Sequence, residues 1–115
     1  MFFVKTAEAE APEFKVIRIP TLEEVIREEL GEDFVRIARC ESGMRQFNED
    51  GSVLISQTSD KGIFQINKVH WEQAKKLGYN IDTVKGNIGY AKYLKDKNGT
   101  SDWYMSRHCW QYDLL

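Results

Sequence analysis

Hydrophobic residues recur with a helical period in several stretches of the chain, and polar segments rich in glycine separate these stretches. The clearest stripe consists of Phe34, Ile37 and Ala38, at positions i, i+3 and i+4. Apolar residues at this spacing share one face of a helix, which is the face that packs against a core. The pattern therefore predicts a helix over about 33–42.

A helix just upstream is predicted by the signals at its two ends. Thr21 and Glu24 have the spacing of a capping box, in which each side chain bonds the backbone N–H of the other residue. Gly31 suits the C-terminal cap, so this helix should cover about 22–30. Three further helices follow from similar signals: about 68–77 with Gly78 as its end, about 83–97 between an Asp82 N-cap and a Gly99 C-cap, and about 103–109 after Asp102.

The stretch between the second and third predicted helices is rich in glycine, serine, asparagine and aspartate. Asn48–Gly51 is a typical turn sequence before the apolar Val53–Ile55, and Gly62–Ile66 supplies a return strand. We therefore expect a small β-hairpin lobe near residues 48–66. The fold class is then α+β, mainly α, with about five helices.

The N-terminal segment lacks helical periodicity. Residues 1–13 are interpreted as a tail, and Phe14–Ile19 alternates like an extended segment. The predicted organisation is thus a tail and extended segment over 1–20, followed by one folded domain over 21–115. The apolar run Met1–Val4 is shorter than the hydrophobic region of a signal peptide, so no signal peptide is expected in this chain.

Length and composition narrow the class of protein. With 115 residues, 42% hydrophobic and 30% charged, the chain has the composition of one globular domain rather than of a disordered segment. Lys and Arg number 16 against 18 Asp and Glu, a net charge of −2, so a nucleic-acid surface is not expected. Membrane insertion is not expected either, because no apolar run approaches the roughly 20 residues that a membrane helix needs.

Glu41 is the polar residue with the most informative position. It follows Ile37 by four residues and Ala38 by three, so it continues the apolar stripe at the C-terminal end of the predicted helix. An apolar setting and the negative end of a helix dipole both raise the pKa of a carboxyl group. General-acid cleavage of a glycosidic bond requires a carboxyl that stays protonated near neutral pH. The alternative is an exposed residue in a last helical turn.

Three segments, in this order, carry a family resemblance: Cys40-Glu41-Ser42-Gly43, Gly62-Ile63-Phe64-Gln65-Ile66-Asn67 and Asn87-Ile88-Gly89-Tyr90-Ala91-Lys92-Tyr93-Leu94. Over about residues 22–110 the chain resembles the lysozyme-like superfamily, specifically the soluble lytic transglycosylase (SLT) domain. The resemblance implies a lysozyme-like fold with Glu41 as the catalytic acid and base. It also implies that Gln65 and Asn67 bind substrate in a glycan groove, and that Ser56 matches a serine near the catalytic carboxyl.

The segment Thr58–Asn67 also resembles the part of c-type lysozymes that carries their second catalytic carboxylate. On that match Asp60 is the nucleophile or charge stabiliser of a retaining hydrolase, which needs two carboxylates about 5 Å apart. The SLT resemblance implies that Glu41 works alone: it protonates the leaving oxygen and then deprotonates the muramyl C6 hydroxyl, which closes a 1,6-anhydro ring. Asp60 as a helper, or as a turn residue that bonds its own backbone, stays open.

The chain departs from the SLT pattern near its C-terminus. The family's Ala-Tyr-Asn-x-Gly segment, whose tyrosine approaches the catalytic glutamate, is replaced by the sequence of residues 102–110. Tyr90, Tyr93 and Tyr104 are the candidates for that role and for substrate binding, and at least one of Tyr90 and Tyr93 should lie in the core. For the two tryptophans of the replaced segment, packing is favoured over sugar stacking.

Cys40 and Cys109 are the two cysteines of the chain. A disulfide between them would fasten the C-terminal segment beside Glu41 and would indicate an oxidising compartment. Two buried free thiols are one alternative. A zinc site that adds His108 is another, although adjacent His and Cys lack the usual ligand spacing. His70 is expected at the surface or at a helix cap.

Together these features predict cleavage of the β-1,4 bond between MurNAc and GlcNAc in peptidoglycan, with lytic transglycosylation as the leading hypothesis. A lysozyme-type muramidase that uses Glu41 and Asp60 is the near alternative. A glycan-binding domain without activity is the alternative from another class. The expected partner is a peptidoglycan glycan strand, bound without cofactor or metal by a monomer that is extracellular or lies in the periplasm or cell envelope.

Overall fold

A computed structural model describes residues 17–112 of the chain. Within that range it contains five α-helices, two 3-10 helices and one two-stranded antiparallel sheet, so the predicted α+β, mainly α fold class is confirmed. The predicted tail over 1–13 lies outside the described residues, as does the start of the predicted extended segment. Residues 17–20 are exposed and belong to no helix or strand.

Helix α2 spans Leu22–Leu30 and begins with the predicted capping box. The N–H of Glu24 donates to the Thr21 hydroxyl at 3.1 Å, and the N–H of Thr21 donates to the Glu24 carboxylate at 3.2 Å. Two of the N–H groups that a helix start leaves without partners are therefore satisfied by side chains, as the spacing predicted.

Helix α3 spans Glu32–Ser42, and its predicted stripe of Phe34, Ile37 and Ala38 is buried. The helix ends at Gly43, whose backbone is left-handed with φ 68°. Because that conformation ends the helix directly after Ser42, Glu41 lies in the last turn with its side chain half-buried.

A small lobe follows, as predicted, over residues 47–67. Isolated bridges pair Phe47 with Val53 and Ile55 with Lys61. Strand β1, Asp60–Lys61, then pairs with strand β2, Ile66–Asn67, in an antiparallel register that sets Asp60 opposite Asn67. The register brings the side chains of these two residues together on one face of the lobe.

Residues 68–110 are mostly helical. The predicted helix over 68–77 starts as a 3-10 turn, and the one predicted over 103–109 is divided between two shorter helices. The elements are η1 over Lys68–His70, α4 over Trp71–Lys76, α5 over Val84–Asn98, η2 over Ser101–Ser106 and α6 over Arg107–Trp110.

The N-cap of α5 differs from the predicted one. The Thr83 hydroxyl, rather than Asp82, accepts a hydrogen bond at 2.9 Å from the N–H of Gly86. Asp82 instead forms an ion pair at 2.9 Å with Lys61 of β1. A cationic partner from the hairpin lobe thus engages the carboxylate that would otherwise have capped the helix.

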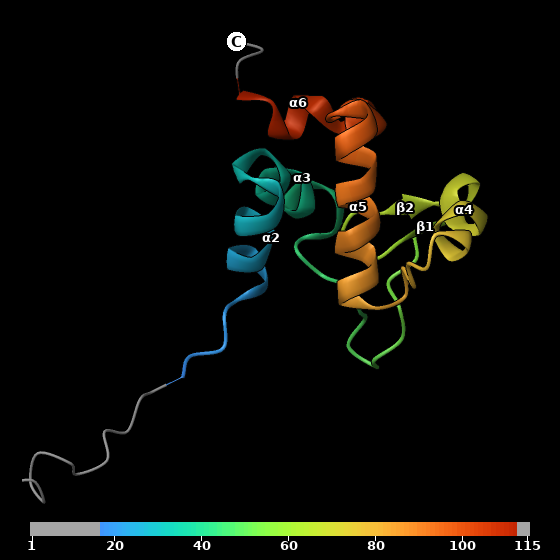
Figure 1. The fold of residues 1–115 in the computed structure, drawn as a ribbon, viewed down its shortest axis with the longest axis horizontal. Helices are drawn as coiled ribbons and strands as arrows, with labels where there is room; N and C mark the ends of the chain where they lie inside the picture. The colour runs from blue at the N-terminus through green and yellow to red at the C-terminus, as the bar shows by residue number, and fades with distance from the viewer. Residues whose placement is uncertain (1–16, 113–115) are drawn as a thin grey trace, which may run out of the picture.

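The helices surround one hydrophobic core. Helix α2 packs against α3 and α5, and α6 and η2 close over α3. Figure 1 shows α5 between the α2–α3 pair on one side and the lobe with β1, β2 and α4 on the other. The largest side chains that are fully buried are those of Tyr90, Phe34, Phe64, Ile26, Ile37 and Ile63. Among the described residues, no helix is both long and apolar enough to cross a membrane.

Candidate active site

A cavity of about 430 Å³ opens where α3, the hairpin lobe and the C-terminal helices meet. This volume is within the range of small-molecule sites in proteins, about 300–1,000 Å³. Its lining contains Glu41 from α3, Asp60 from β1 and Ser106 from η2, as well as Gln65, Asn67 and His70. The two carboxylates singled out in the sequence, 19 positions apart along the chain, therefore face one space.

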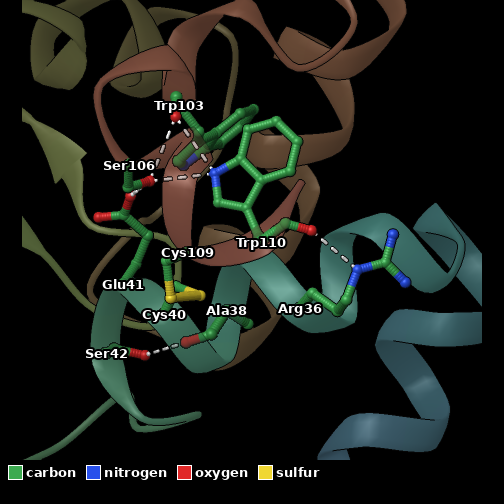
Figure 2. The surroundings of a disulfide bond; sticks show 9 residues. All are labelled: Arg36, Ala38, Cys40, Glu41, Ser42, Trp103, Ser106, Cys109 and Trp110. Carbon is green, nitrogen blue, oxygen red and sulfur yellow. Dashed lines mark hydrogen bonds between the residues drawn. A yellow bond between two sulfur atoms is a disulfide. The ribbon is translucent and has the colours of Figure 1, made fainter. Parts of the chain in front are cut away.

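The carboxyl group of Glu41 is held from the side of the C-terminal helices. The Ser106 hydroxyl donates to Glu41 Oε2 at 2.6 Å, as Figure 2 shows. Burial raises the pKa of Glu41 above its ordinary value, the hydrogen bond from Ser106 partly opposes this, and the charge of Asp60 adds a small further increase. The net direction favours the protonated acid, as the apolar stripe predicted.

Asp60 has the opposite environment. Its Oδ2 accepts hydrogen bonds from Ser56 at 2.7 Å and from Thr58, and its Oδ1 accepts one from Asn67 at 2.8 Å. Burial opposes ionisation of Asp60, but the hydrogen bonds from Thr58, Asn67 and Ser56 outweigh it and lower the pKa. The carboxylate is therefore kept ionised.

One cavity thus holds a carboxyl group whose pKa is raised, Glu41, and one whose pKa is lowered, Asp60. Pairs of carboxyl groups whose surroundings move their pKa values apart can divide the roles of proton donor and charge stabiliser. The arrangement suits chemistry in which an oxygen must be protonated while positive charge develops nearby.

Of the other residues expected in the groove, two line the cavity and one, Ser56, contacts a residue that lines it. Gln65 and Asn67 both line the cavity. The Gln65 side chain donates to the carbonyl of Gly62 at 2.9 Å, which fixes it within the turn between β1 and β2. Ser56, which the resemblance matched to a serine near the catalytic carboxyl, donates a hydrogen bond to Asp60.

None of the three candidate tyrosines is among the residues that line the cavity. Tyr90 is 0% exposed and belongs to the core, which confirms that at least one of Tyr90 and Tyr93 lies there. Tyr93 stacks on Tyr90 with ring centroids 5.5 Å apart. Tyr104 is 55% exposed and has the Arg107 guanidinium 3.6 Å above its ring. The hydroxyl that contacts Glu41 comes from Ser106 instead.

Two residues of the site were missed in the sequence. Ser106 is separated from Glu41 by 65 positions, and an isolated serine gives no local signal. His70 is the N-cap residue of α4, as one of its two expected positions had it, but its place in the cavity was not foreseen. Its Nδ1 lies 3.1 Å from the Tyr90 hydroxyl and its Nε2 lies 3.8 Å from Asp102.

The predicted disulfide between Cys40 and Cys109 is present. Because the two sulfur atoms are bonded to each other, the alternatives of two free thiols and of a zinc site with His108 are wrong. Within residues 17–112, no group of three or more potential metal-ligating side chains comes together. Trp103 and Trp110 are buried, as the preference for packing predicted.

Comparison of the chain with protein-family models, with curated proteins and with solved structures found no match.

Proposed function

We propose that this protein is a glycosidase that cleaves the β-1,4 bond between MurNAc and GlcNAc in peptidoglycan, with Glu41 as the general acid. The observation that carries the proposal is the pair of carboxyl groups in one cavity, Glu41 with a raised pKa and Asp60 with a lowered one. The choice of peptidoglycan rests on the resemblance of the three sequence segments to lysozyme-like proteins.

In this mechanism Glu41 donates its proton to the glycosidic oxygen while the bond from that oxygen to C1 of the sugar breaks. Positive charge develops on C1 and the ring oxygen, and an anion in the same cavity lowers the energy of that state. Asp60 supplies the anion. Glu41, now ionised, then takes a proton from the group that attacks C1.

The attacking group distinguishes two routes. Attack by water gives hydrolysis, as in a lysozyme-type muramidase. Attack by the C6 hydroxyl of the same muramyl ring gives lytic transglycosylation, for which Glu41 alone is sufficient. The three hydrogen bonds that keep Asp60 ionised favour the hydrolytic route, because a retaining hydrolase uses its second carboxylate directly.

Glu41→Gln and Asp60→Asn, assayed on purified peptidoglycan, test the proposal. Glu49→Gln and Asp96→Asn are matched controls, since both remove an exposed carboxylate. Loss of activity in Glu41→Gln alone indicates a single-acid mechanism, and loss in both variants indicates two catalytic carboxylates. Undiminished activity in Glu41→Gln contradicts the proposal.

Mass spectrometry of the products then identifies the route. Hydrolysis leaves reducing muramyl ends, whereas transglycosylation leaves 1,6-anhydro ends that are lighter by one water. A parent protein that releases neither product but sediments with peptidoglycan would support the alternative of a glycan-binding domain.

The disulfide supports action outside the cytoplasm. Disulfides persist in oxidising compartments and are rare where thiols are kept reduced. Peptidoglycan lies in such a compartment, so the bridge and the proposed substrate agree.

A further inference from the structure

The hydroxyl of Ser106 lies at the centre of a small hydrogen-bond network. Its oxygen is 2.6 Å from Glu41 Oε2 and 3.2 Å from the carbonyl oxygen of Trp103. A serine hydroxyl has one proton to donate. Glu41 Oε2 is the stronger of the two acceptors, because it is nearer and belongs to a group that can be charged. The indole N–H of Trp110 donates to the same hydroxyl at 3.1 Å, so one lone pair is occupied and the proton is directed to Glu41.

This donation determines which oxygen of Glu41 carries the acid proton. As long as Oε2 accepts from Ser106, the proton of the neutral acid is carried by Oε1. Figure 2 shows the second carboxyl oxygen pointing away from Ser106 and Trp110. The Ser106 hydroxyl therefore leaves Oε1 to deliver the proton to a ligand.

Two links hold the segment that carries Ser106 against α3. Cys40 directly precedes Glu41, and Cys109 follows Ser106 by three residues, so the disulfide joins the same two segments that meet at the Glu41–Ser106 hydrogen bond. Arg36 of α3 also donates to the carbonyl of Trp110 at 2.9 Å. Cys109 is exposed, so a reductant in solution can reach the bridge.

We propose that Ser106 is a positioning residue for Glu41, and that the Cys40–Cys109 bridge keeps it in place. Reduction of the bridge by a dithiol, which gives two cysteine thiols and oxidises the dithiol to a disulfide, should then lower the activity of the acid. The activity readout of this inference rests on the proposed function. The hydrogen bond itself has a readout that does not, namely the pKa of Glu41 measured by NMR titration.

The first test compares Ser106→Ala with Ser106→Thr, which keeps the hydroxyl, and with Ser101→Ala, an exposed serine at the start of η2. We expect Ser106→Ala to lower kcat about 10- to 100-fold with KM little changed, because the carboxyl is no longer oriented. Ser106→Thr should restore most of the activity, and Ser101→Ala should match the parent. Equal losses in the alanine and threonine variants would overturn the positioning role.

The NMR titration follows the Glu41 carboxyl in the same proteins. Removal of the Ser106 hydrogen bond should raise the pKa of Glu41, because that bond stabilises the carboxylate. The other titratable groups that line the cavity are recorded in the same titration: Asp60, His70, Asp102 and His108. An unchanged Glu41 titration in Ser106→Ala overturns the inference.

The second test removes the bridge with Cys40→Ala/Cys109→Ala, with and without Ser106→Ala. If the bridge acts through Ser106, the alanine at 106 should cost much less activity in the bridge-free protein than in the parent. If Ser106→Ala instead lowers activity by the same factor with and without the bridge, the link between the bridge and Ser106 is overturned. Loss of the native near-UV circular dichroism in the bridge-free protein would overturn it as well, because the bridge would then be needed for folding in general.

The two proposals fail in different ways. If Glu41→Gln keeps full activity, the proposed function fails, but the Glu41 titration still tests the Ser106 contact. If Glu41→Gln is inactive and Ser106→Ala behaves like the parent in both assays, the proposed function stands and only the positioning role is wrong.

Discussion

The side-chain oxygen of Asn87 accepts a hydrogen bond from the backbone N–H of Phe64 at 3.0 Å, which joins α5 to the turn between β1 and β2. The amide nitrogen of the same residue donates to the carbonyls of Lys61 and Ile81, each at 3.0 Å. Asn87 is fully buried, so these contacts replace water for three backbone groups. The turn that follows Asp60 is thus fixed from within the core.

Asn87→Leu should be strongly destabilising. It leaves the N–H of Phe64 and the carbonyls of Lys61 and Ile81 buried without this partner, and we expect a loss of at least about 3 kcal/mol in the free energy of unfolding. Denaturant titration measures it. Asn48→Ala, at an exposed turn, should cost less than about 1 kcal/mol. Similar losses in the two variants would mean that the buried amide is not the anchor of the turn.

Gly62→Ala should damage the same turn from its other side. Gly62 has φ 73°, and a Cβ there would lie 2.3 Å from Gln46 Oε1 and 2.5 Å from Asn87 Nδ2. Backbone strain and overlap together should cost about 3 kcal/mol. Gly51→Ala is the matched control, because Gly51 has φ 89° but nothing within 4 Å of its Cβ position. Gly51→Ala should lower the free energy of unfolding only by the backbone strain, about 1 kcal/mol. If Gly62→Ala is no more destabilising than this control, overlap with Gln46 and Asn87 does not contribute.

The pH dependence of kcat/KM should be bell-shaped. The acidic limb follows ionisation of Asp60, whose pKa is lowered, and the basic limb follows loss of the Glu41 proton, whose pKa is raised. Thr58→Val removes one hydrogen bond to the Asp60 carboxylate, so it should move the acidic limb to higher pH and leave the basic limb in place. An acidic limb that does not move would assign it to another group.

Glu41→Gln should make the protein more stable near neutral pH. A raised pKa means that the fold favours the protonated acid, so the stability that Glu41 contributes is present below its unfolded-state pKa and lost as pH rises through the folded-state value. The glutamine amide is neutral at every pH. The stability advantage of the variant should therefore shrink as the solution is made acidic. Glu49→Gln, at an exposed turn, corrects for the change in net charge.

Removal of the Cys40–Cys109 bridge should lower the free energy of unfolding by about 4 kcal/mol, because it spans 69 residues and restricts the unfolded chain. Denaturant titration of the double alanine variant measures this loss. The parent protein unfolded in the presence of a reductant should show a similar loss. A change below about 1 kcal/mol would indicate that the unfolded chain remains compact without the bridge.

Features set by neighbouring residues were predicted best. The capping box at Thr21 and the buried stripe of α3 depend on residues three or four positions apart, and both are present. The prediction that Glu41 has a raised pKa also followed from its own helix. The Asp82 N-cap failed because Lys61, from a distant segment, pairs with that carboxylate and Thr83 caps the helix instead.

The parts of the site that were missed depend on contacts between distant segments. Ser106 reaches Glu41 only because two 3-10 turns and a kink at Trp103 bring the C-terminal segment over α3. His70 enters the cavity because β2 ends just before it, and Tyr90 of α5 meets its ring. Hydrophobic periodicity and residue spacing do not predict such contacts, because they describe only residues that are close along the chain.

The disulfide closes a covalent ring that includes Glu41, Asp60 and Ser106, and the exposed turn over residues 48–52 lies within that ring. A protease that cuts this turn would therefore leave two fragments that stay linked. On a gel the nicked protein should migrate as two bands only after reduction. Enzymatic nicking could thus sever the backbone between the acid and the carboxylate while both remain parts of one molecule.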